Sequence, residues 1–269
     1  MTTKPQEDPV FRAGLLSNRV AVVTGGGTGI GLGIATCLAK SGADVAIASR
    51  KTEHLEAAAS ALRAHGTRIL PVTMNVREPD SVRTAMQRIV GELGRIDVLV
   101  NNAAGNFYAP SAELSPNGWR AVVETDLYGT FFCSQAVYPV MVGQGGGRII
   151  SISMTLHYRG WPQMAHATAA KAGVDALTKT LALEWARDGI TVNAVAPGPV
   201  PTHGATQAFA GGDTDTDAID EEMRRRIPLG RWGTPDDIGN LIVYLASPAG
   251  AWITGAIVVV DGGSSLAHT

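Results

Sequence analysis

A run of glycines near the N-terminus is the first feature that could do chemistry. It reads Gly25-Gly26-Gly27-Thr28-Gly29-Ile30-Gly31 and follows the apolar run Val20–Thr24. Glycine has no Cβ, so a phosphate can approach the backbone closely. The N-terminus of a following helix would add free N–H groups and the positive end of a dipole. Because the run follows a predicted strand and opens a predicted helix, it predicts a loop that binds the pyrophosphate of a dinucleotide. A flexible turn is the alternative interpretation.

Charges after the second predicted strand indicate which dinucleotide this loop would bind. NAD-specific proteins tend to place an Asp or Glu about 20 residues after the glycines, where it holds the ribose 2′-hydroxyl. Here the strand ends in Ser49, Arg50 and Lys51, without a carboxylate. Arginine can bind phosphate through two parallel hydrogen bonds. We therefore expect Arg50 and Lys51 to bind the 2′-phosphate of NADP, the alternative being that both are ordinary surface cations.

A parallel sheet is the framework that would position these residues. The chain alternates short, near-continuously apolar runs with helical patterns, which is typical of strands buried on both faces. The predicted strands are Val20–Thr24, Asp44–Ser49, Ile69–Asn75, Asp97–Val100, Arg148–Ser153, Ile190–Ala196 and Ala256–Val260. The longer helical patterns are Thr52–His65, Pro79–Leu93, Asn117–Val142, His166–Arg187 and Pro235–Ala246. This rhythm predicts a single-domain α/β, Rossmann-like doubly wound parallel sheet of about seven strands with helices on both faces.

Composition narrows the remaining possibilities for partners and compartment. The 269 residues carry a formal net charge of −2, and no Lys/Arg run is long enough to predict nucleic-acid binding. No apolar run approaches the ~20 residues of a membrane span. Cys37 and Cys133 lie in apolar helical contexts, which predicts buried, reduced thiols. With no apolar segment near residue 1 and no SKL-type C-terminus, we expect a cytoplasmic protein.

The domain organisation follows from the same reading. We expect residues 1–18 to form a polar N-terminal arm and residues 19–269 to form one catalytic domain. The stretch around 203–226 is rich in Gly, Thr and Asp, which predicts a mobile loop over a site. It ends in Arg224–Arg226, either a solvated helix face or a contact for an anionic ligand.

Five motifs in order along the chain resemble the short-chain dehydrogenase/reductase family. They are Thr24-Gly25 with Gly29-Ile30-Gly31, Asn101-Asn102-Ala103-Ala104-Gly105, Ala170-Lys171-Ala172-Gly173, Pro197-Gly198-Pro199-Val200 with Thr202, and Asp261-Gly262-Gly263. The resemblance covers about residues 18–263 and implies a nicotinamide cofactor. Carried over position by position, the expected cofactor-binding residues are Gly25, Gly27, Thr28, Gly29, Ile30, Gly31, Ser49, Arg50, Lys51, Asn75, Val76, Asn102, Ala103, Ala104, Lys171, Pro197, Gly198, Val200 and Thr202.

The departures from the common family pattern are the most informative part. Ordinary members place a tyrosine four residues before the lysine, where its phenol exchanges a proton with the substrate carbinol. Here that position is Ala167, the usual serine position is Met154 beside Ser153, and the usual asparagine is Asp126. A ketone reductase without this donor would lose general-acid assistance of ~10²–10⁴-fold.

One branch of the family, the 2,4-dienoyl-CoA reductases, resembles the chain closely. The shared runs are Ile47–Lys51, Val76–Asp80, Asn101–Phe107, Leu114–Asn117, Arg226–Arg231 and Ala251–Ala256. Asp126, Lys171 and His166, together with the missing tyrosine, resemble the peroxisomal type more than the mitochondrial one. The resemblance implies NADPH-dependent reduction of a 2,4-dienoyl-CoA thioester to a 3-enoyl-CoA, and a homotetramer.

The resemblance also implies roles for particular residues. Lys171 would hold the nicotinamide ribose and lend positive charge, and Asp126 would order a water or relay a proton, unless the two are only a structural pair. Asn106 would donate to the thioester oxygen, unless it caps a loop, and Tyr158 is an alternative donor. For the substrate we expect Arg77 to meet coenzyme A phosphates and Phe107 and Trp161 to line the acyl channel. We expect no metal.

Two rival functions fit the same residues. The first is an NADP-dependent carbonyl reductase in which His157, Tyr158 or His166 serves as a relocated acid. The second is an NADP-binding regulatory or scaffolding protein that has lost its chemistry. All three hypotheses predict the same fold, so substrate turnover has to separate them.

Overall fold

The computed structural model of the protein describes residues 10–201, 221 and 224–267. Its centre is a seven-stranded, all-parallel sheet in the order β3-β2-β1-β4-β5-β6-β7. The strands are β1 (Val20–Thr24), β2 (Asp44–Ser49), β3 (Ile69–Thr73), β4 (Val98–Asn101), β5 (Gly147–Ile152), β6 (Ile190–Pro197) and β7 (Ile257–Val260). The strand order reverses between β1 and β4, and ligands of doubly wound folds bind beyond the carboxyl ends of the strands at such a point.

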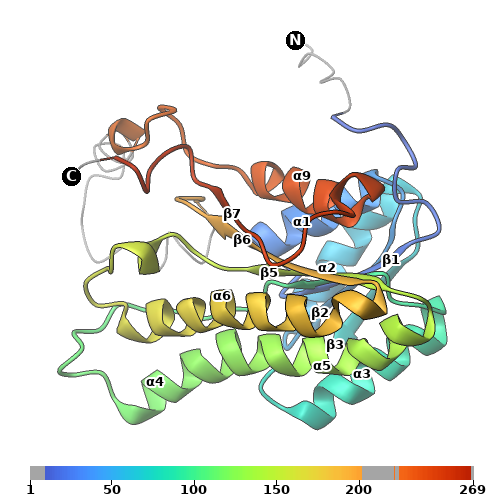
Figure 1. Ribbon diagram of the computed structural model, residues 1–269, viewed down its shortest axis with the longest axis horizontal. Coiled ribbons are helices and arrows are strands. Elements are labelled where there is room, and N and C mark those ends of the chain that lie inside the picture. The colour runs from blue at the N-terminus through green and yellow to red at the C-terminus, as the bar shows by residue number, and fades with distance from the viewer. Residues whose placement is uncertain (1–9, 202–220, 222–223, 268–269) are drawn as a thin grey trace.

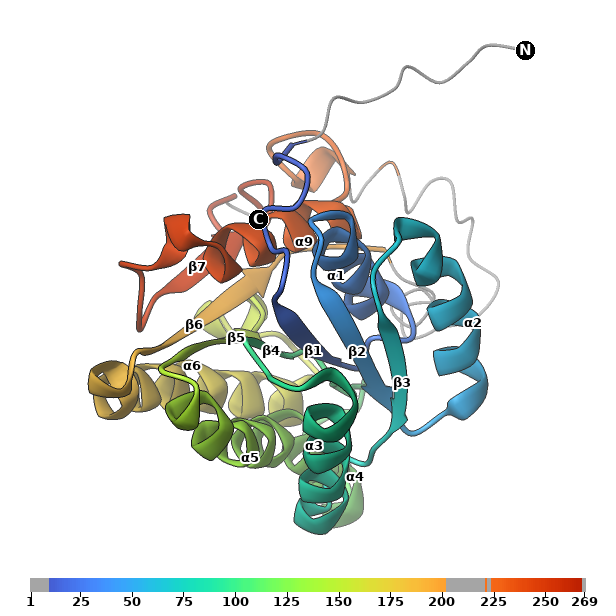
Figure 2. The same ribbon diagram turned by 90° about the vertical axis from the view of Figure 1, so that its right-hand side faces the viewer.

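Helices cover both faces of the sheet (Figures 1 and 2). One face carries α1 (Gly29–Lys40), α2 (Thr52–Leu62) and α9 (Pro235–Ala246), and the other carries α3 (Pro79–Leu93), α4 (Pro116–Val123), α5 (Gly129–Gly143) and α6 (Ala165–Trp185). Each face has its own apolar core, and alternate β1 residues point into one core or the other. This confirms the predicted α/β class, with strand ends that differ by one or two residues from the prediction.

The helix predicted over Asn117–Val142 is interrupted in the structure. Residues Glu124–Tyr128 form a π-helical segment between α4 and α5. Single π-helical turns inside α-helices often occur at functional sites. Here the segment carries Asp126, whose backbone carbonyl accepts a hydrogen bond from the Thr130 hydroxyl at 2.7 Å. Hydrophobic periodicity could not predict this segment, because one wider turn barely disturbs the spacing of apolar residues along the whole stretch.

Short helical turns complete the described chain. They are η1 (Arg63–His65), η3 (Leu156–Tyr158), η4 (Ala186–Asp188) and η5 (Pro248–Gly250). Within the predicted N-terminal arm, Leu16 is buried in the core and its N–H donates to the Ser41 carbonyl at 2.8 Å. The predicted loop at 203–226 lies outside the described residues, apart from Glu221 and the helical 224–226. The boundaries of arm, domain and loop stay predictions.

Candidate active site

Many of the predicted site residues lie in segments that follow the carboxyl ends of six strands, while Asp126 lies in the π-helical segment and Lys171 on α6. Gly25 follows β1, Arg50 follows β2 and Asn75 follows β3. Asn102 follows β4, and Gly198 follows β6. Because the strands are parallel and adjacent, these loops meet at one edge of the sheet. The segment that follows β5 and carries Tyr158 lies between the loops that follow β4 and β6, because β5 lies between those strands in the sheet.

The loop between β1 and α1 needs glycine at two positions to keep its conformation. Gly25 has a φ of +66°, and a Cβ on Gly31 would stand 2.2 Å from the carbonyl oxygen of Gly25. Helix α1 begins at Gly29 after Thr28, whose side chain makes no capping hydrogen bond. The first N–H groups of α1 therefore have no side-chain acceptor and are available to an anion. The loop fits the phosphates of a dinucleotide.

Hydrogen bonds from the β4 loop fix this glycine loop in place. The Asn102 side-chain amide donates to the carbonyls of Thr24 at 2.9 Å and Gly25 at 3.3 Å. The backbone N–H groups of Asn102 and Ala103 both donate to the Thr24 hydroxyl at 2.9 Å. Asn102 thus holds the cofactor loop through its side chain, a role that the motif alone did not reveal.

The cations expected at the ribose phosphate are exposed at the end of β2. Arg50 and Lys51 are both exposed, and neither side chain forms an ion pair with any residue that the structure describes. The Ser49 hydroxyl donates to the Lys51 carbonyl at 3.4 Å, across the turn into α2. Two uncompensated positive charges next to the glycine loop would attract a dianionic group.

The β3 loop is closed on itself. The Asn75 side-chain amide donates to Glu78 at 2.5 Å, and its oxygen accepts from the Arg77 N–H at 3.3 Å. The Arg77 guanidinium is held by Glu124, just before Asp126. Val76 is buried against Gly129 of α5. Asn75 therefore caps its own turn, and the contacts predicted for Asn75 with the cofactor and for Arg77 with coenzyme A stay predictions.

The Pro197-Gly198 motif lies where β6 ends. The N–H of Gly198 donates to the Val260 carbonyl at 3.0 Å, and a Cβ on Gly198 would stand 2.4 Å from Cβ of Asp261. Pro197 and Val200 are buried beside it. The Asp261-Gly262-Gly263 motif therefore packs against the Pro197-Gly198 motif. Thr202, predicted to bind cofactor, lies outside the described residues.

A buried ion pair lies between these cofactor loops and helix α6. Nζ of Lys171 is 3.4 Å from Oδ2 of Asp126, and both side chains are almost completely buried. Oδ1 of Asp126 accepts from the Gly105 N–H at 2.9 Å, and Nζ of Lys171 donates to the Ile152 carbonyl at 2.7 Å. The pair thereby joins the β4 loop, the π-helical segment, α6 and the end of β5.

Burial dominates the electrostatics of Asp126. Desolvation raises the pKa of its carboxyl above the ordinary value, although the Lys171 ammonium and the Gly105 N–H act to lower it. The charge of His166 also acts to lower this pKa, although more weakly. A carboxyl group with a raised pKa beside an ammonium can hold a proton and pass it on.

The hydroxyl groups of ordinary family members have no counterpart beside this pair. Ala167 is fully buried and packs with Val122 and Met164. Ser153 is buried, and its hydroxyl donates to Asp175 at 2.6 Å, so it is turned toward α6. The position four residues before Lys171, which holds a tyrosine in ordinary family members, is therefore occupied here by a small side chain in an apolar cluster.

Candidate substrate residues come from two neighbouring loops. Asn106 and Phe107 are exposed in the loop after β4, and Tyr158 and Trp161 are exposed after β5. The N–H of Ala109 donates to the Gln163 carbonyl at 3.0 Å, which links the two loops. The Phe107 ring meets the buried His166 ring edge-on, with centroids 4.5 Å apart. These residues can line one opening, and their roles stay predictions.

One buried cluster near the site was missed at the sequence level. Asp175, on α6, contacts Ser153 and His157. The sequence signal for this cluster was that Asp175 follows Lys171 by four residues, a spacing that places both side chains on one face of a helix. That spacing alone does not reveal that partners come from a segment about twenty residues away in the chain.

Searches for other site types gave two findings on the described residues. In the ranges 10–201 and 224–267, no three His, Cys, Asp or Glu side chains lie close enough together to ligate a metal ion. Within the same part of the chain, no helix is both long and apolar enough to span a membrane.

Comparison with known proteins identifies the family. A family model described as enoyl-(acyl carrier protein) reductase matches residues 25–265. The chain belongs to this family of short-chain dehydrogenases/reductases. It is therefore an oxidoreductase, and the family and fold indicate a nicotinamide cofactor.

Relatives and solved structures agree on this family. The peroxisomal 2,4-dienoyl-CoA reductase [(3E)-enoyl-CoA-producing] of Danio rerio is 41% identical over 96% of this chain and 85% of its own length. A probable 2,4-dienoyl-CoA reductase [(2E)-enoyl-CoA-producing] of Bacillus subtilis is 37% identical over 93% of this chain and 98% of its own. A variant of actinorhodin polyketide ketoreductase, solved with NADPH, superposes with a TM-score of 0.88 at 36% identity, over 94% of this chain and 99% of that one.

Proposed function

We propose that the protein catalyses NADPH-dependent reduction of a 2,4-dienoyl-CoA thioester to a 3-enoyl-CoA, acting on a CH–CH bond. The observation that carries the proposal is the buried Asp126–Lys171 pair beside an apolar Ala167. A ketone reductase needs a phenol there, whereas a conjugated thioester is reduced at a carbon remote from its oxygen. The names of the Danio rerio and Bacillus subtilis relatives support this substrate class.

The residues present fit NADP. The glycine loop with the open N-terminus of α1 would hold the pyrophosphate, and Arg50 with Lys51 would hold the 2′-phosphate. When bound, the cofactor supplies a hydride. Lys171 is buried in its ion pair with Asp126, and its ammonium would contact the nicotinamide ribose and add positive charge.

Protein groups would then supply a proton and stabilise charge on the thioester oxygen. Burial raises the pKa of the Asp126 carboxyl, which favours a role for this group in a proton relay that includes Lys171 and a water. Asn106 and Tyr158 are the two exposed donors from neighbouring loops that could reach the oxygen. Protonation at the α carbon gives the 3-enoyl product, whereas protonation at the γ carbon would give the 2-enoyl product named for the Bacillus subtilis relative.

Substrate binding is proposed on the same opening. Phe107 and Trp161 are large apolar side chains on the two linked loops, where they would line the acyl channel. Arg77 would meet a coenzyme A phosphate only by sharing or leaving its ion pair with Glu124. Replacing Arg77 should therefore raise KM for the CoA thioester rather than lower kcat.

A spectrophotometric assay of NADPH oxidation with 2,4-hexadienoyl-CoA tests the proposal. Turnover, with a 3-enoyl-CoA identified by mass spectrometry and NMR, supports it. Turnover of ketones alone would support a carbonyl reductase instead. Cofactor binding with no turnover of any substrate would support a regulatory protein. Replacing NADPH by NADH tests the assignment of Arg50 and Lys51, since Arg50→Ala should raise KM for NADPH and leave that for NADH unchanged.

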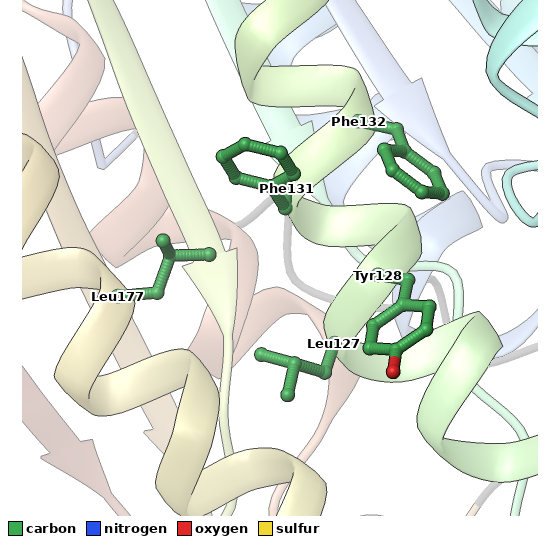
Figure 3. Close-up of a pocket in the computed structure, with 5 residues that line it drawn as sticks. All are labelled: Leu127, Tyr128, Phe131, Phe132 and Leu177. Carbon is green, nitrogen blue, oxygen red and sulfur yellow. The ribbon is translucent and has the colours of Figure 1, made fainter. Parts of the chain in front are cut away.

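We also propose that the protein is a homotetramer. Leu127, Tyr128, Phe131, Phe132 and Leu177 line an apolar groove between the π-helical segment, α5 and α6 (Figure 3). Tyr128 and Phe131 are exposed, as are Val259 on the edge strand β7 and Trp252 in the segment before it. Apolar surface of this extent favours contact with further copies of the chain. Light scattering should give a tetramer for the wild type and a smaller species for Phe131→Glu, with Glu184→Gln as a control; a monomeric wild type would contradict the proposal.

The compartment stays a prediction. A cytoplasmic protein was expected from the sequence, whereas the name of the Danio rerio relative places that protein in peroxisomes. Microscopy of a tagged full-length chain in its native cell would decide between them.

A further inference from the structure

A second buried carboxylate lies one helical turn beyond Lys171. Asp175 follows Lys171 by four residues on α6, so both side chains lie on the same face of the helix. Oδ1 of Asp175 accepts from the Ser153 hydroxyl at 2.6 Å, and Oδ2 lies 2.8 Å from Nε2 of His157. All three side chains are buried or nearly buried. The proposed reaction does not use any of them.

These contacts join the same two parts of the chain as the lysine does. Lys171 donates to the carbonyl of Ile152, which directly precedes Ser153. Helix α6 therefore holds the segment between β5 and η3 at three successive points: Ile152, Ser153 and His157. The Ser153 bond restrains the orientation of the Ile152–Ser153 peptide, and with it the acceptor that fixes the Lys171 ammonium.

The His157 bond restrains the turn that carries Tyr158. Nδ1 of His157 is buried and has no hydrogen-bond partner among the described residues, so Asp175 is the group that orients the ring. The rings of His157 and Tyr158 lie in contact, with centroids 4.3 Å apart. Tyr158 itself is 46% exposed. Burial, and next the charge of the Asp175 carboxylate and a side-chain hydrogen bond to it, raise the pKa of the Tyr158 hydroxyl, which favours the neutral phenol.

The same residue types could be mistaken for an acyl-transfer triad. In such a triad the carboxylate orients the histidine and the histidine contacts the serine. Here the carboxylate stands between serine and histidine, and Ser153 is only 3% exposed. The cluster therefore cannot present a nucleophile to a substrate, and its geometry is that of a brace. The same contacts weigh against His157 as a relocated acid, because its side chain is 8% exposed.

We propose that Asp175 is a positioning residue: through Ser153 it fixes the carbonyl that holds Lys171, and through His157 it fixes the turn that presents Tyr158. The proposal deepens the proposed function and rests on it for the assay. It predicts that loss of the carboxylate impairs the chemical step more than it weakens cofactor binding, because Lys171 and its acceptor carbonyl are still present.

The main test compares Asp175→Asn with the wild type. An amide offers one acceptor oxygen in place of two, so it keeps both contacts only by donating to Nε2 of His157, which requires the other tautomer of the ring. We expect kcat with NADPH and 2,4-hexadienoyl-CoA to fall by up to about 100-fold, the loss that a misplacement near 1 Å produces. The dissociation constant of NADPH, measured by fluorescence, should rise by a much smaller factor than kcat falls. Asp188→Asn is the matched control, because Asp188, in η4 after α6, likewise accepts from a hydroxyl, that of Tyr138 at 3.0 Å.

A conservative replacement separates positioning from general stability. Gln at position 157 can still donate to Asp175, whereas Ala cannot, so His157→Gln should keep kcat near that of the wild type and His157→Ala should lower it. A purely structural brace would lower Tm and leave the kcat of the folded protein unchanged in all these variants. If Asp175→Asn does not fold, the pair at position 157 carries the test.

A titration makes the outcome independent of the substrate. Tyrosinate absorbance should show one tyrosine with a lower pKa in Asp175→Asn, and this change should be missing when Tyr158→Phe is added. An unshifted titration, or equal kcat for wild type and Asp175→Asn, would overturn the proposal. A wild type inactive toward dienoyl-CoA would instead refute the proposed function, and the titration would still decide whether Asp175 controls Tyr158.

Discussion

Asp126 and Lys171 form a buried ion pair, which in the proposed reaction would take the place of a phenol. Neither is exposed, and each keeps one further hydrogen bond, to the Gly105 N–H and the Ile152 carbonyl. Removing one partner of such a pair leaves an uncompensated buried charge, which is costly. For that reason the informative replacement is Asp126→Asn, which keeps the shape and removes the proton.

Asp126→Asn should lower kcat by ~10²–10⁴-fold, the usual contribution of a positioned acid or base. Since the amide still accepts from the Gly105 N–H, NADPH affinity should change little. Lys171→Met should lower kcat and also weaken NADPH binding, because the ammonium is expected to serve both. Stopped-flow kinetics with fluorescence titration measures the two effects separately. Near-wild-type kcat in Asp126→Asn would leave the pair as a structural feature only.

The pH dependence of the wild type should carry the signature of the same carboxyl. Burial raises its pKa, so Asp126 keeps its proton to a higher pH than an ordinary aspartic acid does. If the protonated form supplies the substrate proton, kcat falls as pH rises through this raised pKa. The falling limb should be absent in Asp126→Asn. An identical limb in both proteins would assign it to another group.

Both cysteines should be unreactive in the folded protein. Burial raises the pKa of the Cys133 thiol to about 12, and burial with the nearby Asp236 carboxylate raises that of Cys37 to about 12. Alkylation requires the thiolate, which is then scarce at neutral pH. Mass spectrometry should find no iodoacetamide adduct on the native protein and two after unfolding in urea. Rapid labelling of the native state would mean that one helix opens.

At the scale of elements, the sequence predicted the strands and helices whose positions depend on local apolar patterns and on glycine or proline. Strand β1 and helix α3 have the predicted ends, since buried apolar runs and the Pro79 start are local signals. The π-helical segment at Asp126 and the Asp175 cluster were not predicted. Both depend on side chains from separate elements, and the pairing of Asp175 with Ser153 exists only once β5 and α6 pack together.

The glycine loop offers an element-level prediction with an internal control. A methyl group on Gly31 would stand 2.2 Å from the Gly25 carbonyl oxygen, so Gly31→Ala must displace the loop. We expect it to weaken NADPH binding strongly, as calorimetry would show. In helix α3, a Cβ on Gly91 meets nothing within 4 Å, and Gly91→Ala should stabilise the protein by up to about 1 kcal/mol. Equal NADPH affinity for Gly31→Ala and the wild type would contradict the assigned loop.

At the scale of the whole molecule, the two edges of the sheet have different tasks. The carboxyl edge carries the loops of the candidate site, and the amino edge carries a charged network around Asp97. This buried carboxylate accepts from Arg19, from Arg95 and from the Val20 N–H. It thereby ties the segment before β1 to the start of β4, between which the strand order reverses.

This division predicts that Asp97 controls stability and not catalysis. Burial alone would raise its pKa, but the hydrogen bonds from Arg95, Val20 and Arg19 outweigh it and the pKa is lowered. A lowered folded-state pKa gives stability that is present above the unfolded pKa of about 3.9 and is lost as pH falls through the folded value. Asp97→Asn should therefore cost about 1–3 kcal/mol at neutral pH, as urea unfolding would measure. The difference between mutant and wild type should shrink in acid, while kcat stays unchanged. A loss of kcat without a loss of stability would show that the amino edge is coupled to the site across the full length of the strands.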